Sequence, residues 1–179
     1  SIDVGKKNLQ QCADSVLRLR SEYLFKSKQY DKIIFHLTNG QEFPYIKYRD
    51  GYRLKVEGNK TSLIKTAQPD SSYGAFRQYL DVLFTYAGTL SLSNESKNLD
   101  KSNMKIGDIF IKGGTPGHCV IIVDMCENDK GEKMFLLAQG YMPAQQIHVL
   151  KNPESKSPWY SVNDLKYPFK TPEFTFEEN

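Results

Sequence analysis

The sequence has few cysteines, a single tryptophan and no long apolar run. Its three cysteines, Cys12, Cys119 and Cys126, are too few for a disulfide scaffold, and the odd number leaves at least one thiol free within the chain. Neither the cysteines nor the three histidines are spaced as zinc ligands, so we expect no metal and no cofactor. No apolar segment approaches the roughly 20 residues that cross a bilayer, which excludes a transmembrane helix from this sequence.

The sequence also lacks a large excess of either charge. Its formal net charge is +3, and the Lys and Arg residues are scattered among 21 acidic residues without a basic stripe, so we expect no nucleic-acid binding. With 179 residues, 39% of them hydrophobic, the chain is long enough for one substantial core, and we expect a single domain over 1–179. The N-terminus has neither an initiator Met nor an apolar signal core. We therefore expect a protein exported to the periplasm or cell envelope after loss of a signal segment.

Two segments have the apolar periodicity of amphipathic helices. In the first, apolar residues recur at steps of three and four over 9–23, and Asn8 with Gln11 is typical of a capping pair at its start. The second helix is predicted over 72–87. Gly88 follows it and is expected to be its C-terminal cap.

Shorter patterns indicate strands and connections in the first half of the chain. Residues 33–38 alternate in polarity and lead into the turn signal at 39–40, which predicts a strand. The pattern over 43–56 fits either further strands or a short helix. Residues 57–72 and 91–105 are polar, which is typical of connections.

The segment 107–141 carries the clearest sheet pattern. Gly107 and Asp108 precede a short apolar strand and a Gly-rich loop, and both faces of the next strand, 119–125, are apolar, which is typical of the centre of a sheet. Turn residues at 128–131 lead to a partner strand. We expect one more strand over 147–150.

His118 opens the central strand, and Gln139 is predicted to lie beside it. If Asp129 and Lys130 are the central residues of the hairpin, Val120 faces Gln139, and His118 and Gln139 share a face of the sheet. Gln139 would then bind one ring nitrogen of His118 and leave the other for proton transfer. A change of one residue in loop length would move Gln139 to the opposite face. The alternative is a turn histidine satisfied by backbone and solvent.

Cys12 is the candidate nucleophile. Capping at Asn8 would put it in the first helical turn, where the helix dipole lowers the pKa of a thiol. The alternative is that it packs as a small hydrophobe, since it lies on the apolar stripe of its helix. Cys119 adjoins His118 but points to the other face of the strand, so we expect it to pack in the core.

Four further residues are weaker candidates for substrate binding. Gly114 and Gly117 permit close approach of a ligand to the backbone, although they equally suit a loop that needs positive φ angles. Tyr141 and Trp159 could supply stacking surfaces for a peptide or glycan. Trp159 belongs to an aromatic, Pro-rich segment, 151–179, which we expect to wrap around the rest of the domain.

Four segments of the chain are distinctive as a set: 11–24, 86–92, 113–124 and 137–145. Together they resemble an uncharacterised family of bacterial domains of unknown function, number 4846, common in Bacteroidetes. The resemblance covers most of the chain and implies no particular biochemistry.

Gly107-Asp108, His118 and Gln139 follow one another in the order found in papain-like cell-wall amidases and endopeptidases, which the chain distantly resembles. In those enzymes a helix that leads into a Gly-x-x-Leu segment begins with the nucleophilic cysteine. The corresponding helix here begins at 73–77 and has no cysteine. The resemblance therefore implies either that Cys12 supplies the thiol from an earlier helix or that the fold is kept without thiol catalysis.

These observations predict an α+β fold with two main helices packed on a mostly antiparallel, papain-like sheet. The first functional hypothesis is a thiol hydrolase or amidase of the cell envelope that acts on peptide or peptidoglycan-like amide bonds. In it Cys12 is the nucleophile, His118 the general base and Gln139 the residue that orients the base. The second hypothesis is a catalytically inactive envelope protein that binds a peptide or glycan in the same cleft. Nothing in the sequence indicates an oligomeric state.

Overall fold

The computed structural model describes residues 3–5 and 7–178. The helices are α1 (Cys12–Lys26), α2 (Tyr45–Arg49), α3 (Tyr73–Tyr86) and α4 (Thr89–Glu95), with 3-10 turns η1 (Tyr30–Lys32) and η2 (Lys101–Asn103). The strands are β1 (Ile34–His36), β2 (Glu42–Pro44), β3 (Tyr52–Glu57), β4 (Lys60–Lys65), β5 (Ile109–Lys112), β6 (His118–Glu127), β7 (Lys133–Gln139), β8 (His148–Val149), β9 (Tyr160–Ser161), β10 (Phe169–Lys170) and β11 (Thr175–Phe176). This mixture of helices and antiparallel sheets is consistent with the α+β class.

The main sheet has the strand order β5-β6-β7-β8, and β9 also pairs with β7. All of its neighbouring strands are antiparallel. Three separate hairpins accompany it, formed by β1 with β2, β3 with β4, and β10 with β11. The strand that begins with His118 is therefore interior to the main sheet, as its apolar faces predicted.

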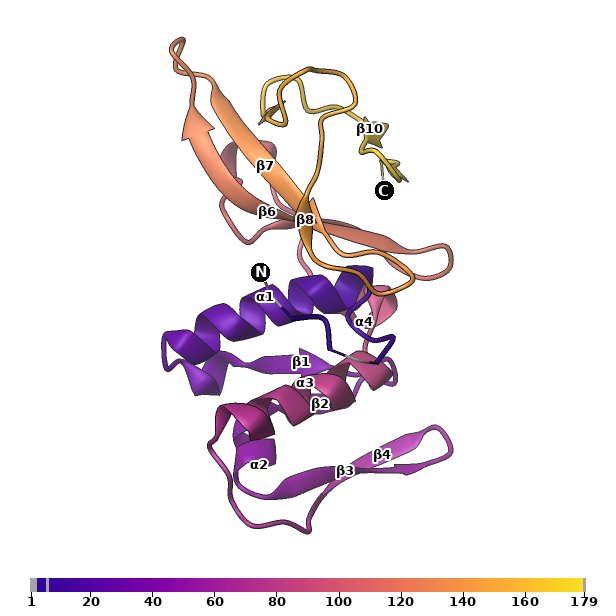
Figure 1. Cartoon of the computed structure of the whole chain (residues 1–179). Helices are drawn as coiled ribbons and strands as arrows, with labels where there is room; N and C mark the ends of the chain where they lie inside the picture. The colour runs from indigo at the N-terminus through magenta and orange to yellow at the C-terminus, as the bar shows by residue number, and fades with distance from the viewer. Residues whose placement is uncertain (1–2, 6, 179) are drawn as a thin grey trace.

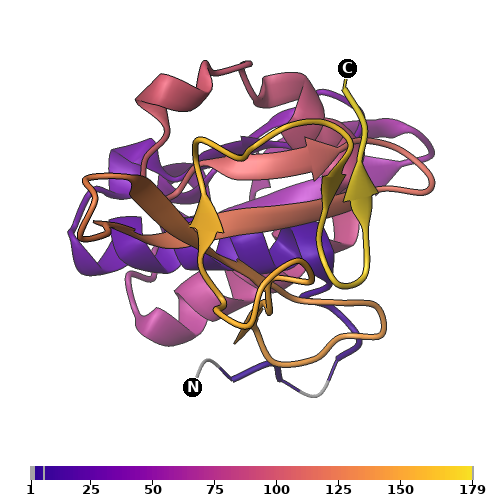
Figure 2. The same cartoon turned by 90° about the horizontal axis from the view of Figure 1, so that it is seen from above.

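The main sheet is covered on both faces (Figure 1). Helix α1 covers one face, and residues 151–178, the C-terminal segment, cover the other. Seen from above, the C-terminal segment crosses the sheet (Figure 2). Side chains of β6 alternate between two cores: Cys119 and Ile121 pack with the helices, whereas Val120 and Ile122 pack with the C-terminal segment. The first core continues through α1 to α3 and the β1-β2 hairpin.

Helix α1 is an interior helix. Six consecutive residues, 13–18, are buried, because the sheet covers one side of the helix and α3 with β1 covers the other. Arg18 is among them, and its Nε lies 2.7 Å from Oε1 of the buried Glu22. A helix enclosed in this way cannot keep one polar face, so its buried polar groups must pair with one another.

The structure corrects the predicted start of α1. The backbone N–H of Gln11 donates to Oδ2 of Asp14 at 2.9 Å, so Gln11 precedes the first helical residue, Cys12. Asn8 lies outside the helix, and its Oδ1 accepts the backbone N–H of Ala144 at 2.8 Å. Cys12 is still in the first turn.

Helix α3 agrees with the prediction except at its end. Oγ of Ser72 accepts the backbone N–H of Ala75 at 3.1 Å, which caps the start of the helix. Gly88 has an extended φ of −177°, so it is not the left-handed C-terminal cap that we expected. It lies at the start of α4 instead, where its N–H donates to Oγ of Ser91.

Two segments predicted to be connections contain regular structure. Strand β4 lies within 57–72, and α4 lies within 91–105 apart from its first two residues. Strand β4 is largely exposed, and its sequence, Lys-Thr-Ser-Leu-Ile-Lys, lacks the polarity alternation that a buried face imposes. Helix α4 has only seven residues, too few for a periodic pattern. The ambiguous segment 43–56 contains both alternatives, α2 and most of β3.

Candidate functional site

His118 and Gln139 are hydrogen-bonded partners on one face of the main sheet. Nε2 of His118 lies 2.8 Å from Oε1 of Gln139. Nε2 of Gln139 in turn donates to Oε2 of Glu173, also at 2.8 Å. Glu173 belongs to the C-terminal segment, so this chain of three side chains joins β6, β7 and that segment.

The shared face of His118 and Gln139 agrees with the prediction, although the hairpin differs from the one assumed. Glu127 faces Lys133, so the turn between them is one residue longer than expected. A β-bulge between Ile122 and Asp124 then shifts the register back by one residue. Beyond the bulge Ile121 faces Ala138, which puts Gln139 on the face of His118.

The order of these hydrogen bonds determines the tautomer of His118. The carboxylate of Glu173 can only accept, so the amide NH₂ of Gln139 faces it and the amide oxygen faces the imidazole. Nε2 of His118 therefore carries the proton and donates. Its Nδ1 makes no hydrogen bond to any residue in 3–5 or 7–178.

His118 lies in an aromatic environment beneath the C-terminal segment. Its ring centroid is 5.1 Å from that of Phe174, 5.8 Å from that of Tyr141 and 6.2 Å from that of Phe176. The residue is only 4% exposed. Burial lowers the pKa of His118 below its usual 6.5, although Gln139 and Glu173 act in the opposite direction. The imidazole is thus neutral and enclosed at neutral pH.

Cys12 lies against the other face of β6. Burial raises the pKa of its thiol above 9.0, and the Asp14 carboxylate adds to this, while backbone N–H groups, among them that of Cys119, partly oppose it. The side chain of Cys119 is fully buried in the core that α1 shares with the sheet, as predicted. The thiol is therefore neither activated nor open to solvent on all sides.

The structure brings His118 and Gln139 together but not Cys12 with them. Val120 and Ile122, which have the parity of His118, pack with the C-terminal segment, whereas Cys119, the neighbour of Cys12, packs with α1. By strand parity the imidazole therefore faces the C-terminal segment and Cys12 lies on the α1 face of β6, an arrangement that disfavours direct proton transfer between them.

Asp14, in the first turn of α1, is a buried carboxyl. Burial raises its pKa from 3.8 to about 6, against the hydrogen bonds from the backbone N–H groups of Gln11 and Gln10. A raised acid pKa means that the folded state holds the proton more tightly than the unfolded state. Stability from this group is complete below about pH 4 and is lost as the pH rises through 6.

We expect Asp14→Asn to gain stability relative to the parent protein as the pH rises from 4 to 7. Asparagine keeps an acceptor for Gln11 but has no charge to bury, so the difference in free energy of unfolding should grow by about 2–3 kcal/mol. Urea unfolding at several pH values measures it. A difference that does not change with pH would show that Asp14 titrates normally.

The weaker candidates are dispersed. Tyr141 contacts the ring of His118, but Trp159 is half-buried where its carbonyl accepts a hydrogen bond from Asn152 at 2.9 Å. A Cβ at Gly117 would collide with Oγ1 of Thr89, so this glycine is needed for packing. Gly114 has a φ of +94° with open space around it.

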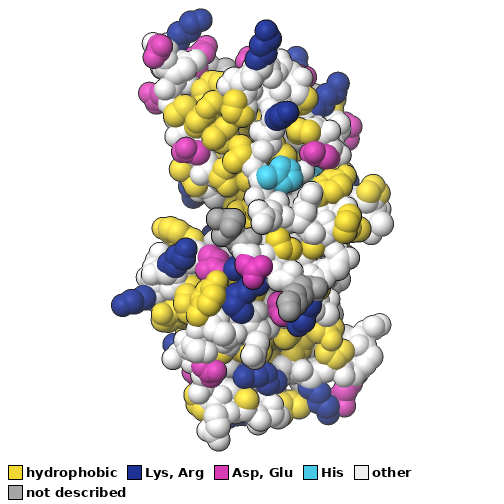
Figure 3. Space-filling view, viewed as in Figure 1, with side chains coloured by type: hydrophobic (Ala, Val, Ile, Leu, Met, Phe, Trp, Pro, Cys, Tyr) yellow, Lys and Arg dark blue, Asp and Glu magenta, His cyan; other side chains and the backbone are white. Residues whose placement is uncertain are grey.

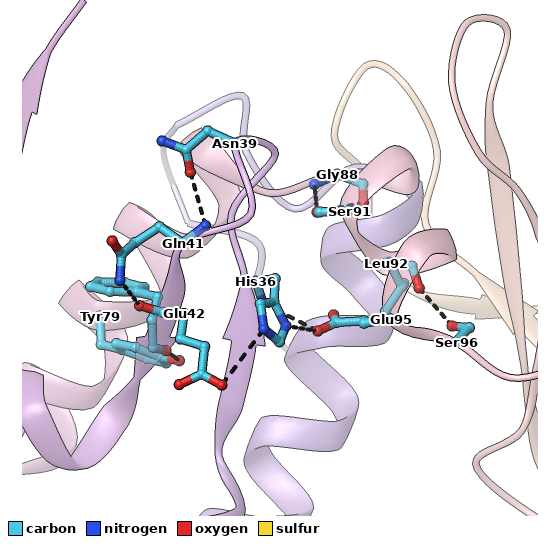
Figure 4. A network of polar contacts seen from close by, with 11 residues as sticks. His36, Asn39, Gln41, Glu42, Tyr79, Gly88, Ser91, Leu92, Glu95 and Ser96 are labelled. Carbon is cyan, nitrogen blue, oxygen red and sulfur yellow. Dashed lines mark hydrogen bonds and ion pairs between the residues drawn. The ribbon is translucent and has the colours of Figure 1, made fainter. Parts of the chain in front are cut away.

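No sequence pattern indicates His36 as part of a site. Its Nδ1 lies 2.8 Å from Oε2 of Glu95, which also accepts the backbone N–H of His36 at 3.2 Å (Figure 4). Its Nε2 lies 3.7 Å from Oε1 of Glu42. The histidine therefore stands between two carboxylates, one from α4 and one from β2. Because α4 was predicted to be a loop, no pattern placed Glu95 beside β1.

A pocket of about 210 Å³ opens beside this histidine. It is lined by His36, Leu37, Thr38, Gly40, Ser91, Asn94 and Glu95. The side chain of His36 is 39% exposed and that of Glu95 is 20% exposed, so both are reachable. Ser91 is not a free nucleophile, because its Oγ bonds to both backbone groups of Gly88. The pocket thus offers polar acceptors without a nucleophile.

Other classes of site are not visible in the described part of the chain. Among residues 3–5 and 7–178, no group of three His, Cys, Asp or Glu side chains could hold a metal ion. No helix in these ranges is long and apolar enough to cross a membrane. On the face shown in Figure 3, Lys and Arg side chains are interspersed with Asp and Glu.

Comparison with known proteins identifies a family but no characterised relative. Neither the curated proteins nor the solved structures contain a match to this chain. The sequence model of one family, described as domain of unknown function 4846, matches residues 1–179. The distinctive segments quoted above therefore have a common explanation: the chain belongs to the domain of unknown function 4846 family.

Proposed function

We propose that this domain acts by binding a ligand that carries a primary ammonium group, and that the pocket beside His36 is its binding site. The observation that carries the proposal is the half-exposed His36, held by Glu95 at the edge of that pocket. Glu42 lies on the other side of the ring and does not line the pocket. The Glu95 carboxylate in the lining favours a cationic group.

The positions of Cys12 and His118 support binding over thiol hydrolysis. A thiol hydrolase needs the base within hydrogen-bond reach of its nucleophile. Cys12 contacts the helix-facing side of β6, whereas His118 lies under the C-terminal segment. Burial also raises the pKa of the thiol, which opposes formation of the nucleophilic thiolate.

The composition of the His36 pocket favours an amine over a sugar. Its lining supplies the Glu95 carboxylate, the Asn94 amide and the Thr38 hydroxyl, all of which can accept a hydrogen bond. No lining residue has a phenylalanine, tyrosine or tryptophan ring on which a sugar could stack. An amino group of a short peptide fits these acceptors.

The papain-like resemblance is part of the same proposal. An antiparallel sheet with an interior strand that begins with a histidine supports this part of the proposal, whereas the position of Cys12 differs from that of the nucleophile in those enzymes. We propose a related core in which His118 and Gln139 anchor the C-terminal segment and the domain recognises a peptide without thiol catalysis.

The test is a titration of the protein with Nα-acetyl-lysine amide, followed by NMR shifts of His36 and its neighbours. We expect a dissociation constant of about 1 mM, typical of a small ligand in a small pocket. Glu95→Gln keeps the shape and an acceptor for His36 but removes the charge, so affinity should fall about 10-fold. Glu57→Gln, on the exposed β3-β4 hairpin, is the matched control and should leave binding unchanged.

Two results would count against this function. Equal losses in Glu95→Gln and Glu57→Gln would mean that overall charge, not the pocket, attracts the amine. Binding of N-acetylglucosamine at the same residues, with no response to the lysine probe, would favour a glycan instead.

A further inference from the structure

A second pocket lies between the N-terminal segment and α3. Its volume is about 190 Å³, and it shares no lining residue with the His36 pocket. Val4, Leu9 and Phe84 give it apolar walls, while Lys7 and Arg77 bring two positive charges and Asp81 one negative charge. The charged residues of this lining sum to a positive charge, whereas Glu95 gives the lining of the His36 pocket a negative one.

The two cations of this pocket differ in their partners. Nζ of Lys7 lies 2.8 Å from Oδ2 of Asp81, so this charge is already paired. Arg77 has no carboxylate partner within residues 3–5 and 7–178. Its Nη1 is buried and makes no hydrogen bond to a described residue. A buried guanidinium nitrogen without an acceptor is unfavourable, so an acceptor supplied by a ligand would bind strongly for its size.

The chain leaves room for such a ligand beside the guanidinium. Gly5 has a φ of +79°, and the nearest atom to a Cβ built there is Nη2 of Arg77 at 4.0 Å. The N-terminal segment therefore passes the guanidinium at a residue without a side chain. Among the described residues, Gly5 places no side chain against the nitrogens of Arg77.

We propose that this pocket binds a carboxylate that carries a small apolar group, with Arg77 as the anchor. A guanidinium presents two parallel N–H donors that match the two oxygens of a carboxylate. The apolar part would pack on Leu9 and Phe84. A cavity of about 150 Å³ holds benzene, so this pocket admits a group of four to six carbon atoms. A free short-chain acid and the C-terminal residue of a peptide share this chemistry.

Isothermal titration with isobutyrate, Nα-acetyl-alanine and the amide of the latter tests the proposal. We expect the carboxylates to bind with a dissociation constant of about 1 mM and the amide at least 10-fold more weakly. Tighter binding of acetyl-alanine than of isobutyrate would identify the ligand as a peptide C-terminus. Tighter binding of isobutyrate would identify it as a free short-chain acid. Both results support the pocket.

Variants locate the site. Arg77→Gln should weaken carboxylate binding at least 10-fold, and Arg77→Lys should weaken it less, because lysine keeps the charge but loses the paired donors. Arg20→Gln removes an exposed positive charge from α1 and should leave binding unchanged. Thermal unfolding of each variant shows that it is folded. Three results would each overturn the proposal. They are equal binding of acid and amide, equal losses of affinity in Arg77→Gln and Arg20→Gln, and no heat from the parent protein when the carboxylate concentration is ten times the expected dissociation constant. None of these outcomes affects the His36 pocket.

Discussion

Replacing Gly140 by alanine is expected to lower the free energy of unfolding by about 1–3 kcal/mol. A Cβ at this position would collide with Oγ of Ser15 and lie 3.2 Å from the carbonyl oxygen of Gln11. Ser15 is fully buried and its Oγ already donates to that carbonyl at 2.8 Å, so it cannot move away. The first turn of α1 would have to separate from the end of β7. Urea denaturation measures the loss.

A second substitution distinguishes this collision from other effects of alanine. Ser15→Ala in the Gly140→Ala background removes the colliding oxygen but leaves the Cβ of residue 15 at 3.1 Å, so we expect it to restore part of the stability. Gly88→Ala is the control, because Gly88 is extended and has no atom within 4 Å of a built Cβ. If Gly140→Ala unfolds at the same urea concentration as the parent protein, α1 does not contact the end of β7.

Gln139→Leu is expected to cost about 2–3 kcal/mol of stability, since it leaves the Nε2–H donor of a buried His118 without an acceptor. Adding His118→Phe removes that donor as well and should restore most of the loss, because both polar partners are then replaced by apolar groups. Glu173 needs no partner in the double variant, since it is exposed to water. Thermal and urea unfolding of the four proteins complete the cycle.

The same cycle has a pH dependence with a definite sign. The pKa of His118 is lowered in the folded state, so below pH 6.5 the unfolded chain binds the additional proton and the parent protein loses stability. The double variant lacks this group and should lose less stability than the parent protein as the pH falls from 7 to 5. An equal loss in both proteins would mean that His118 is not buried as a neutral group.

The sequence predicts the secondary structure where one face of an element is buried and the element is long. Helix α3 and strands β6 and β7 satisfy both conditions, and their patterns located them. Helix α4 and strand β4 do not, because one is short and the other is mostly exposed, so tertiary contacts rather than local periodicity define them. The predicted start of α1 was wrong because Asn8 with Gln11 and Gln11 with Asp14 both have the spacing of a capping pair. Only the tertiary hydrogen bond from the backbone N–H of Ala144 to Asn8 distinguishes them.

Only the part of the candidate site that depends on strand pairing was predictable from the sequence. Parity alone separated His118 from Cys119. The pairing of His118 with Gln139 also needed a hairpin register, and the assumed turn gave the correct face because the β-bulge offsets the longer turn. Parity says nothing about which face of the sheet receives α1, and this determines where Cys12 lies. Glu173 lies 34 residues from its partner Gln139, and Glu95 lies 59 residues from its partner His36. At such separations no local pattern in the sequence indicates either carboxylate.

The β-bulge in β6 separates the hairpin tip from the polar residues at the other end of the strands. Because the extra residue lies between Ile122 and Asp124, the pairing on the site side does not follow directly from the number of residues in the turn. The additional residue of the turn at 128–132 is offset by this bulge, and Gln139 keeps the face of His118 for that reason. A hairpin with the shorter turn would need an unbulged β6 to keep the same two side chains together.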